Sequence, residues 1–431
     1  MPEPGGDMRV EAELPPLVVP ESDDSARRTR GRALGFVLLT IFVDTMGIGI
    51  IIPVLPGLLL ELVGGSLGSV AIYGGWLMFL FAGLQFLTAP VLGNLSDSFG
   101  RRPVLLVSLA VYGLDLLIMG WAPTIVWLFI GRALSGIFGA TYVVASAYIT
   151  DVTSMEDRSR AFGWMGAAFG LGFVIGPAIG GILGDEAHRL PFFVAAGLAA
   201  ANVVYGYFVL PESLDPANRR PFSLRRAHAV GALRRLFRYP VVGGLLAALL
   251  LFNVAHDANP ATWTFATMDK FGWTAFDVGL SMTFMGICVA MSQGVVLGPA
   301  MRFFGEHRAI VVGFALVALS FLGYALAWQG WMMYLWMVPY ALGSIAGPAT
   351  TAVLSKQVPA NFQGELQGAL SALRSITSCI APLLMTGLFS YFTRPGAPVH
   401  FPGVAFLAAS ILTVGTLMGV IGALRRVRNA G

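Results

Sequence analysis

The chain has 431 residues, of which 56% are hydrophobic and only 12% charged, whereas a soluble domain carries about 25% charged residues. This composition excludes a soluble enzyme and indicates a membrane protein, and the net charge of +4 lies in arginine clusters between apolar runs rather than in a nucleic-acid-binding patch. The two cysteines, Cys288 and Cys379, lie inside apolar runs, so we expect no disulfide framework, no metal site and no cofactor. The sequence also has no P-loop for ATP hydrolysis.

Twelve apolar runs recur along the chain, each near the roughly 20 residues that a spanning helix needs. They lie at 34–60, 70–92, 104–122, 125–149, 161–184, 191–210, 240–268, 275–300, 309–328, 330–354, 367–391 and 402–424. The sequence therefore predicts an all-α membrane protein of twelve transmembrane helices in two pseudo-symmetric six-helix halves, 33–210 and 240–424. The polar, proline-rich residues 1–32 are expected to form a disordered cytoplasmic tail, residues 211–239 a basic cytoplasmic linker, and residues 425–431 a second cytoplasmic tail.

Three ionisable residues lie inside apolar runs of the first half. Asp44 and Asp115 are carboxylates at membrane depth, where a charge is costly. Each either binds a proton or substrate, or is a structural acid hydrogen-bonded to a neighbouring helix. Arg132 cannot lose its proton, so it needs a carboxylate or water beside it, and the two aspartates are its natural partners. We expect the three residues to carry proton coupling.

The stretch Gly93–Val104, G-N-L-S-D-S-F-G-R-R-P-V, is a polar island between two apolar runs and must lie at the membrane surface. Gly93 and Gly100 are expected to permit a tight reversal of the backbone. Asp97, Arg101 and Arg102 place both signs of charge in this short loop. The alternative is an ordinary turn with arginines on the cytoplasmic side.

Two further features of the first half concern its ends and its packing. Asp151 ends the 125–149 run at the same surface as the polar island. The run 161–184 is rich in glycine, and it carries Pro177. Small residues let helices approach closely, so we expect an interface between the halves at this run. The residues expected to form it are Gly172, Gly176, Pro177 and Gly180.

The linker alternates arginines with Phe and Leu, which predicts an amphipathic helix on anionic headgroups, with a specific partner site as the alternative. In the second half, Asn253, His256 and Asp257 cluster before a helix-breaking proline, where substrate or proton contact is expected. Gln293 is a further substrate candidate. Arg374 either joins them or only reaches the cytoplasmic surface with its long side chain.

An internal repeat supports the two halves. Several glycines and a proline recur 205 residues later, which fits parallel six-helix repeats around a midplane cavity. The pairs are Gly93 and Gly298, Gly100 and Gly305, Gly163 and Gly368, and Pro177 and Pro382. Orientation follows from the arginine and lysine excess, because cytoplasmic loops carry it. With both termini in the cytoplasm, the polar island, the linker and the C-terminal arginines all lie inside, and only Arg189, Lys270 and Arg394 lie outside.

These motifs resemble the major facilitator superfamily, and within it the twelve-helix drug:proton antiporters, most closely the tetracycline/proton antiporter branch. The resemblance covers about residues 34–424. It is carried by D-T-M-G-I-G-I-I-I-P-V-L-P, G-N-L-S-D-S-F-G-R-R-P, G-R-A-L-S-G-I-F-G-A-T, G-P-A-I-G-G, F-V-L-P-E-S-L and Q-G-E-L-Q-G-A-L.

The resemblance implies that Asp97, Arg101 and Asp151 form a cytoplasmic charge cluster near the start of helix 11, and that this cluster locks the outward-facing state. It also implies that Asp44, Asp115 and Arg132 occupy intramembrane positions used by the branch. The branch usually has a carboxylate in helix 9 and a histidine in helix 8. Both are missing here, and His256 and Asp257 are candidate replacements one helix away.

We therefore expect a proton-coupled antiporter that exports an amphipathic small molecule, with tetracycline-like drugs as the first hypothesis. The alternatives are an importer or uniporter of a small metabolite, and a receptor-like protein on the same fold. The expected partners are the substrate, protons and membrane lipids, with no nucleic acid. The expected location is a bacterial inner membrane, where the protein would act as a monomer.

Overall fold

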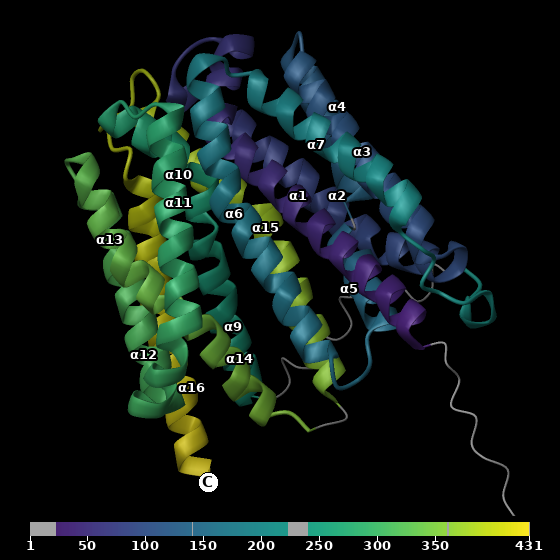
Figure 1. Ribbon diagram of the computed structural model, residues 1–431. Helices are drawn as coiled ribbons and strands as arrows, with labels where there is room; N and C mark the ends of the chain where they lie inside the picture. Colours follow the sequence, from purple (N-terminus) through teal and green to yellow (C-terminus); the bar gives the residue numbers. More distant parts are fainter. Residues whose placement is uncertain (1–22, 140, 223–239, 360–361, 431) are drawn as a thin grey trace, which may run out of the picture.

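The computed structural model describes residues 23–139, 141–222, 240–359 and 362–430, and nearly all of this described chain is helical (Figure 1). The first half consists of α1 (Asp23–Val63), α2 (Leu67–Phe99), α3 (Arg101–Trp121), α4 (Ile125–Phe138), α5 (Thr141–Val152), α6 (Arg158–Glu186) and α7 (Leu190–Val209), followed by the short 3₁₀ helix η1 (Pro216–Asn218). The second half consists of α9 (Pro240–His256), α10 (Ala258–Phe271), α11 (Ala275–Met291), the π-helical η3 (Ser292–Val296), α12 (Leu297–Leu326), α13 (Gly330–Gly343), α14 (Ala346–Lys356), α15 (Gln363–Thr393) and α16 (Val404–Ala430).

The described chain holds eleven helical stretches that are long and apolar enough to cross a membrane. One of them, Ala275–Leu326, has 52 residues, far more than the roughly 20 that one crossing needs. It turns at Gly305, where the backbone leaves the helical region with φ 71° and ψ 162°. This stretch therefore contains the two predicted runs 275–300 and 309–328, and all twelve predicted runs are accounted for.

The internal repeat is visible in the backbone at two glycines. Gly100, between α2 and α3, has φ 105° and ψ 157°, close to the values at Gly305. A side chain at such a positive φ is strained, so glycine is favoured at both turns. Gly93 differs from our expectation, because it lies inside α2 and takes no part in the reversal. The predicted loop is thus a break of one residue between two helices.

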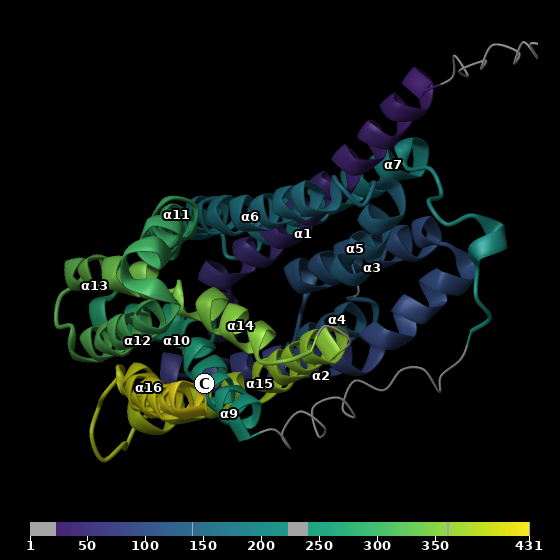
Figure 2. The ribbon, with the colours of Figure 1, turned by 90° about the horizontal axis from the view of Figure 1, so that it is seen from below.

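We call the end of the bundle that carries Gly100 and Gly305 the loop end, and the opposite end the far end. Toward the far end, one apolar core is shared by both halves and includes Ile50 and Phe192 with Trp263 and Phe406. At the loop end the apolar cores are separate, one within each half. The view from the loop end shows the two groups of helices on either side of the molecule (Figure 2).

Small residues join the halves at the far end. The Cα atoms of Gly181 on α6 and Gly279 on α11 are so close that a Cβ on Gly181 would lie 3.2 Å from the other Cα. Two hydrogen bonds also cross between the halves: the Thr264 hydroxyl donates to the Ile52 carbonyl (3.3 Å) and the Thr283 hydroxyl to the Val174 carbonyl (2.9 Å). The far end is therefore the closed end of the molecule in this conformation.

The glycines of α6 serve a different neighbour from the one predicted. Positions 172, 176 and 180 face α1 of the same half, where a Cβ on Gly172 would lie 2.7 Å from the Phe42 carbonyl oxygen. Of the four predicted residues, Pro177 alone lies against both helices, next to Gly49 on α1 and Gly279 on α11. The expected interface between halves is thus mainly a helix contact within the first half, because glycines four residues apart line one face of a helix.

The boundaries of the halves differ slightly from those predicted. Helix α1 begins at Asp23, so the end of the predicted disordered tail is helical, and helix-favouring Ala and Arg residues there extend the spanning helix beyond the apolar run. Residues 1–22 and the arginine-rich 223–239 lie outside the described residues, so the amphipathic linker helix remains a prediction. The described start of the linker folds back on α2, where the Arg220 N–H donates to the Asp97 carbonyl (3.1 Å).

Candidate functional site

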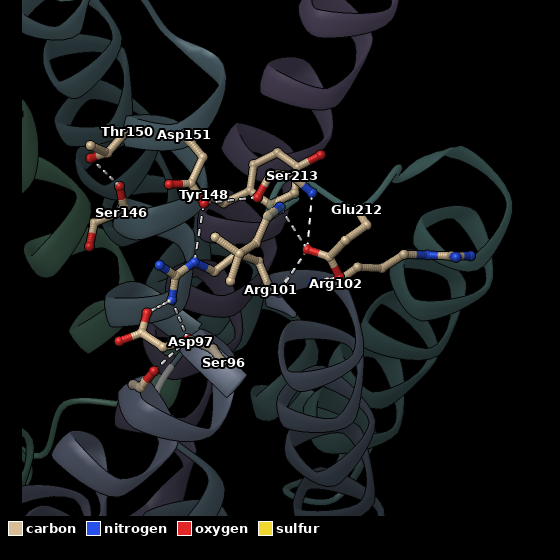
Figure 3. A network of polar contacts seen from close by, with 12 residues as sticks. Ser96, Asp97, Arg101, Arg102, Ser146, Tyr148, Thr150, Asp151, Glu212 and Ser213 are labelled. Atoms are coloured by element: carbon tan, nitrogen blue, oxygen red, sulfur yellow. Dashed lines mark hydrogen bonds and ion pairs between the residues drawn. The ribbon is translucent and has the colours of Figure 1, made fainter. Parts of the chain in front are cut away.

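A buried arginine organises the charged residues of the loop end (Figure 3). Arg101, the first residue of α3, is only 9% exposed. Its Nη1 lies 2.5 Å from Asp97 Oδ1 and donates to Ser96 Oγ at 2.7 Å, while its Nε lies 3.2 Å from Asp151 Oδ2. The predicted residues Asp97, Arg101 and Asp151 thus meet around one guanidinium. They do so because α2 ends, α3 begins and α5 ends at the loop end of the bundle.

Glu212, just beyond α7, is part of this cluster and was not among the predicted residues. Its carboxylate accepts hydrogen bonds from the backbone N–H groups of Arg101 (2.8 Å) and Arg102 (3.3 Å). The first N–H groups of a helix have no partner within it and attract negative charge, so Glu212 completes the start of α3. A Cβ on Gly100 would lie 2.7 Å from Glu212 Cδ, which gives Gly100 a second reason to be glycine.

Arg102 points away from the cluster, as Figure 3 shows. Its Nη2 donates to the Tyr207 carbonyl (2.5 Å), and its guanidinium lies 5.7 Å from the centre of the Tyr207 ring. It therefore ties α3 to α7 instead of joining Arg101. Gly93 is also apart from the cluster, since a Cβ at this position would have Val143 as its nearest neighbour, at 3.8 Å.

A polar cavity of about 410 Å³ opens beside the cluster, lined by Asp97, Arg101, Asp151 and Arg220 among others. The Ser213 hydroxyl also donates to Asp151 Oδ2 at 3.1 Å. The cluster thus connects α2, α3, α5 and the start of the linker, all within the first half. Such a network can hold these helix ends in one arrangement until a charge is removed or paired with another partner.

A second charged pair lies deep in the first half. The Arg132 guanidinium on α4 forms an ion pair with the Asp115 carboxylate on α3, whose side chain is fully buried. Arg132 also lies over the ring of Phe81, 5.4 Å from its centre. Of the two partners predicted for Arg132, the structure places Asp115 beside it.

Asp44 stands apart from this pair. It is half-buried on α1, and its carboxylate makes no hydrogen bond or ion pair with any residue of the described chain. The contact with α3 is made by its backbone, because the Tyr112 hydroxyl donates to the Asp44 carbonyl (3.1 Å). The carboxylate is thus free to bind a proton or a ligand.

The second half contains a polar group at a break between two helices. Helix α9 ends at His256 and α10 begins at Ala258, because Pro260 has no N–H to donate to the His256 carbonyl. His256 Nδ1 and the Tyr340 hydroxyl of α13 share a hydrogen bond of 2.8 Å, and the two rings are nearly parallel. The Asn259 side chain also lies beside Tyr340.

Arg374 on α15 lies near this group. The residue is the twelfth of α15, about 16 Å along the helix from its start at a rise of about 1.5 Å per residue. Its positive charge acts on both His256 and Asp257, and Ser378, one turn further along α15, lies beside Asp257. The Arg374 side chain is exposed and forms no ion pair with a residue of the described chain, so both interpretations of Arg374 stay open.

The other two substrate candidates are less closely connected. Asn253 accepts the Asp257 N–H through its backbone (3.0 Å), and no hydrogen bond of its side chain is found in the described chain. Gln293 lies in η3, and its side chain is exposed. A π-helical segment frequently marks a functional site, but no contact within the described chain brings Gln293 to His256.

Known proteins share this architecture. Residues 37–382 match the Major Facilitator Superfamily. The fold also resembles the nucleoside transporter NupG, with a TM-score of 0.74 at 13% identity over 91% of this chain and 99% of that one. A bacterial homologue of the human lysosomal transporter Spinster, in an inward-facing and occupied conformation, gives a TM-score of 0.75 at 14% identity over 92% and 97%. The predicted fold of two six-helix halves is confirmed.

Proteins found by sequence comparison have a higher identity to this chain than the solved structures just described. The chain is 43% identical to the class C tetracycline resistance protein of Escherichia coli, over 83% of this chain and 90% of that protein. It is 40% identical to the class G tetracycline resistance protein of Vibrio anguillarum, over 82% and 89%. The chain therefore belongs to the Major Facilitator Superfamily and, within it, to the family of the tetracycline resistance proteins.

Proposed function

We propose that this protein exports tetracycline-like drugs from bacterial cells in exchange for protons. The observation that carries the proposal is the 43% identity to a tetracycline resistance protein across 90% of that protein's length. The ionisable groups at membrane depth in both halves support it, because a membrane protein keeps such costly groups where they act on an ion or a substrate.

Proton coupling is assigned to the first half. Arg132 keeps its charge, so protonation of Asp115 would remove the charge that offsets it and weaken the pair. Asp44 has a carboxylate without a partner in the described chain and can take the proton or a cationic group of the drug. Substrate binding and proton binding then compete for carboxylates in one half, which is the requirement for exchange.

The other contacts with the substrate are assigned to the break between α9 and α10 in the second half. His256, Asp257, Tyr340 and Arg374 offer donors, acceptors and both signs of charge, and the ring of Phe252 lies beside His256. An amphipathic drug with many hydroxyl and carbonyl groups needs this mixture of polar and aromatic contacts. Asn253 and Gln293 are proposed to complete the site when drug is bound.

The loop end is proposed to face the cytoplasm of the cell, with the protein in the inner membrane as a monomer. The arginine excess at this end supports the assignment. The cluster of Asp97, Arg101, Asp151 and Glu212 would then hold the cytoplasmic helix ends of the first half. With the far end closed, the conformation is inward-facing, and the drug enters from the loop end.

Everted membrane vesicles test the direction and the energy source. We expect respiring everted vesicles that contain the protein to accumulate tetracycline, and a proton uncoupler to abolish the accumulation. Asp44→Asn should show no accumulation, whereas the exposed Asp185→Asn should behave as the wild type. Accumulation in right-side-out vesicles instead would identify an importer, and uptake unaffected by the uncoupler would identify a uniporter.

A further inference from the structure

A cavity of about 510 Å³ lies on the outer side of the second half, between α12 and α16 at the loop end. Its wall is apolar over most of its area and includes Val311, Val312, Ile421 and Leu424. Arg308 and Arg425 line the same cavity, one from each helix. It lies apart from the charged cluster and from the break at Asp257, and neither drug binding nor proton coupling uses it.

The two arginines have no charge partner. Both are exposed, and neither forms an ion pair or a hydrogen bond through its side chain in the described chain. The nearby carboxylate of Glu306 is already engaged by Lys356 of α14. The cavity thus presents two positive charges that no acidic side chain of the described residues neutralises.

The surface leading to the cavity is apolar along both helices. On α12 the exposed side chains Val312, Leu319, Leu322 and Leu326 recur at the spacing of one helix face. On α16 the exposed Ile411, Val414 and Met418 form a second stripe, which reaches the cavity at Ile421. In a spanning protein such stripes face the hydrocarbon of the bilayer, and the arginines stand where the stripes end.

We propose that this cavity binds one anionic phospholipid, with its phosphate between Arg308 and Arg425 and its acyl chains along the two stripes. The charge requires an anion, and the continuous apolar path requires a ligand with long hydrocarbon chains. A basic pocket between transmembrane helices is the known form of an anionic headgroup site. A bound lipid would join α12 to α16, the last helix of the chain. The site is independent of the drug that the protein exports.

Native mass spectrometry of the purified protein tests the proposal with phosphatidylglycerol as the probe. We expect one phosphatidylglycerol to be retained in preference to phosphatidylcholine with the same acyl chains. Each arginine near an anionic headgroup contributes about fivefold to affinity, so Arg308→Gln and Arg425→Gln should each weaken retention of the lipid about fivefold. The double variant should weaken retention more than twentyfold, which is roughly the product of the two single effects. Arg302→Gln removes an exposed arginine at the same end that does not line the cavity, and it should retain the lipid normally.

Two further arms separate the possible outcomes. Soluble glycerol phosphate should not displace the lipid, because it lacks acyl chains, and displacement at low concentration would overturn the acyl-chain part of the proposal. Arg308→Lys keeps the charge and should retain binding even if the glutamine variants are poorly folded. Equal retention of phosphatidylglycerol and phosphatidylcholine, or equal losses in Arg302→Gln and Arg308→Gln, would show only a general lipid belt and would overturn the site.

Discussion

At the scale of single residues, the two aspartates in the membrane differ in what holds them. Asp115 is fully buried and paired with Arg132, whereas Asp44 is half-buried and its carboxylate has no partner in the described chain. Their sequences do not separate them, since each is a lone acid in an apolar run. The pairing can nevertheless be anticipated from the positions of the two residues in consecutive antiparallel helices. Asp115 precedes the end of α3 by about as many residues as Arg132 follows the start of α4, so both lie at the same depth in the membrane.

This difference predicts different costs of neutralisation. Asp115→Asn leaves the Arg132 charge buried without its partner, a loss of about 3–5 kcal/mol in such pairs. Asp115→Asn should therefore lower the unfolding temperature of the purified protein. The double variant Asp115→Asn with Arg132→Gln should recover most of the lost stability, because it removes the unpaired charge. Asp44→Asn removes no pair and should leave the unfolding temperature unchanged while it abolishes export. Equal unfolding temperatures for both single variants would show that the Asp115–Arg132 pair does not stabilise the fold.

Glu212 could not be found from composition or hydropathy, because an acid in a loop is ordinarily solvated. Its role follows only when the end of α7 and the start of α3 are brought together. Glu212→Gln should lower the stability by about 1 kcal/mol, since it removes a negative charge from a helix N-terminus. Thermal unfolding of purified protein measures the change, with the exposed Glu156→Gln as the matched control. Equal unfolding temperatures for Glu212→Gln and Glu156→Gln would mean that the charge of Glu212 does not stabilise the start of α3.

At the scale of elements, hydropathy predicts the spanning helices well, because a run of apolar residues has few other uses in a chain of this composition. It does not predict where a helix breaks. Both the turn at Gly100 and the fold of the Ala275–Leu326 stretch at Gly305 depend on positive φ. The polar motif and the repeat mark both glycines, but they mark Gly93 equally, and Gly93 is helical. The break at Asp257 is more predictable, since Pro260 stands three residues later.

Three glycines of the loop-end segments test this view of the turns. Gly93 is helical and an added Cβ would make only an ordinary van der Waals contact with Val143, so Gly93→Ala should be tolerated. Gly305→Ala places a side chain at positive φ with open space and should cost about 1–2 kcal/mol. Gly100→Ala adds a clash with Glu212 and should cost more than Gly305→Ala. The unfolding temperatures of the three variants give the order of their stabilities. A loss of stability in Gly93→Ala as large as that in Gly100→Ala would contradict the assignment of the turn to Gly100.

At the scale of the whole molecule, the halves share a core at the far end and have separate cores at the loop end. Exchange between the two sides of a membrane requires the far-end contact to open. A Cβ on Gly286 of α11 would lie 3.5 Å from the Val174 Cβ of α6, within the range that a disulfide spans. The contact can therefore be locked by two cysteines.

In a background in which Cys288 and Cys379 are replaced by Ser, the pair Val174→Cys and Gly286→Cys should form a disulfide on oxidation and lose transport. Reduction should restore transport, and Val174→Cys alone should be insensitive to the oxidant. Full transport by the oxidised, cross-linked protein would show that this contact does not open during the cycle.

The central claim, that drug moves in exchange for protons, is tested most directly in liposomes with purified protein and an imposed pH gradient. With an acidic interior, we expect tetracycline to accumulate inside above the level of protein-free liposomes. Nigericin, which collapses the gradient, should remove this excess, and so should Asp44→Asn. The same excess with and without the gradient, or in Asp44→Asn, would contradict proton-coupled exchange through this residue.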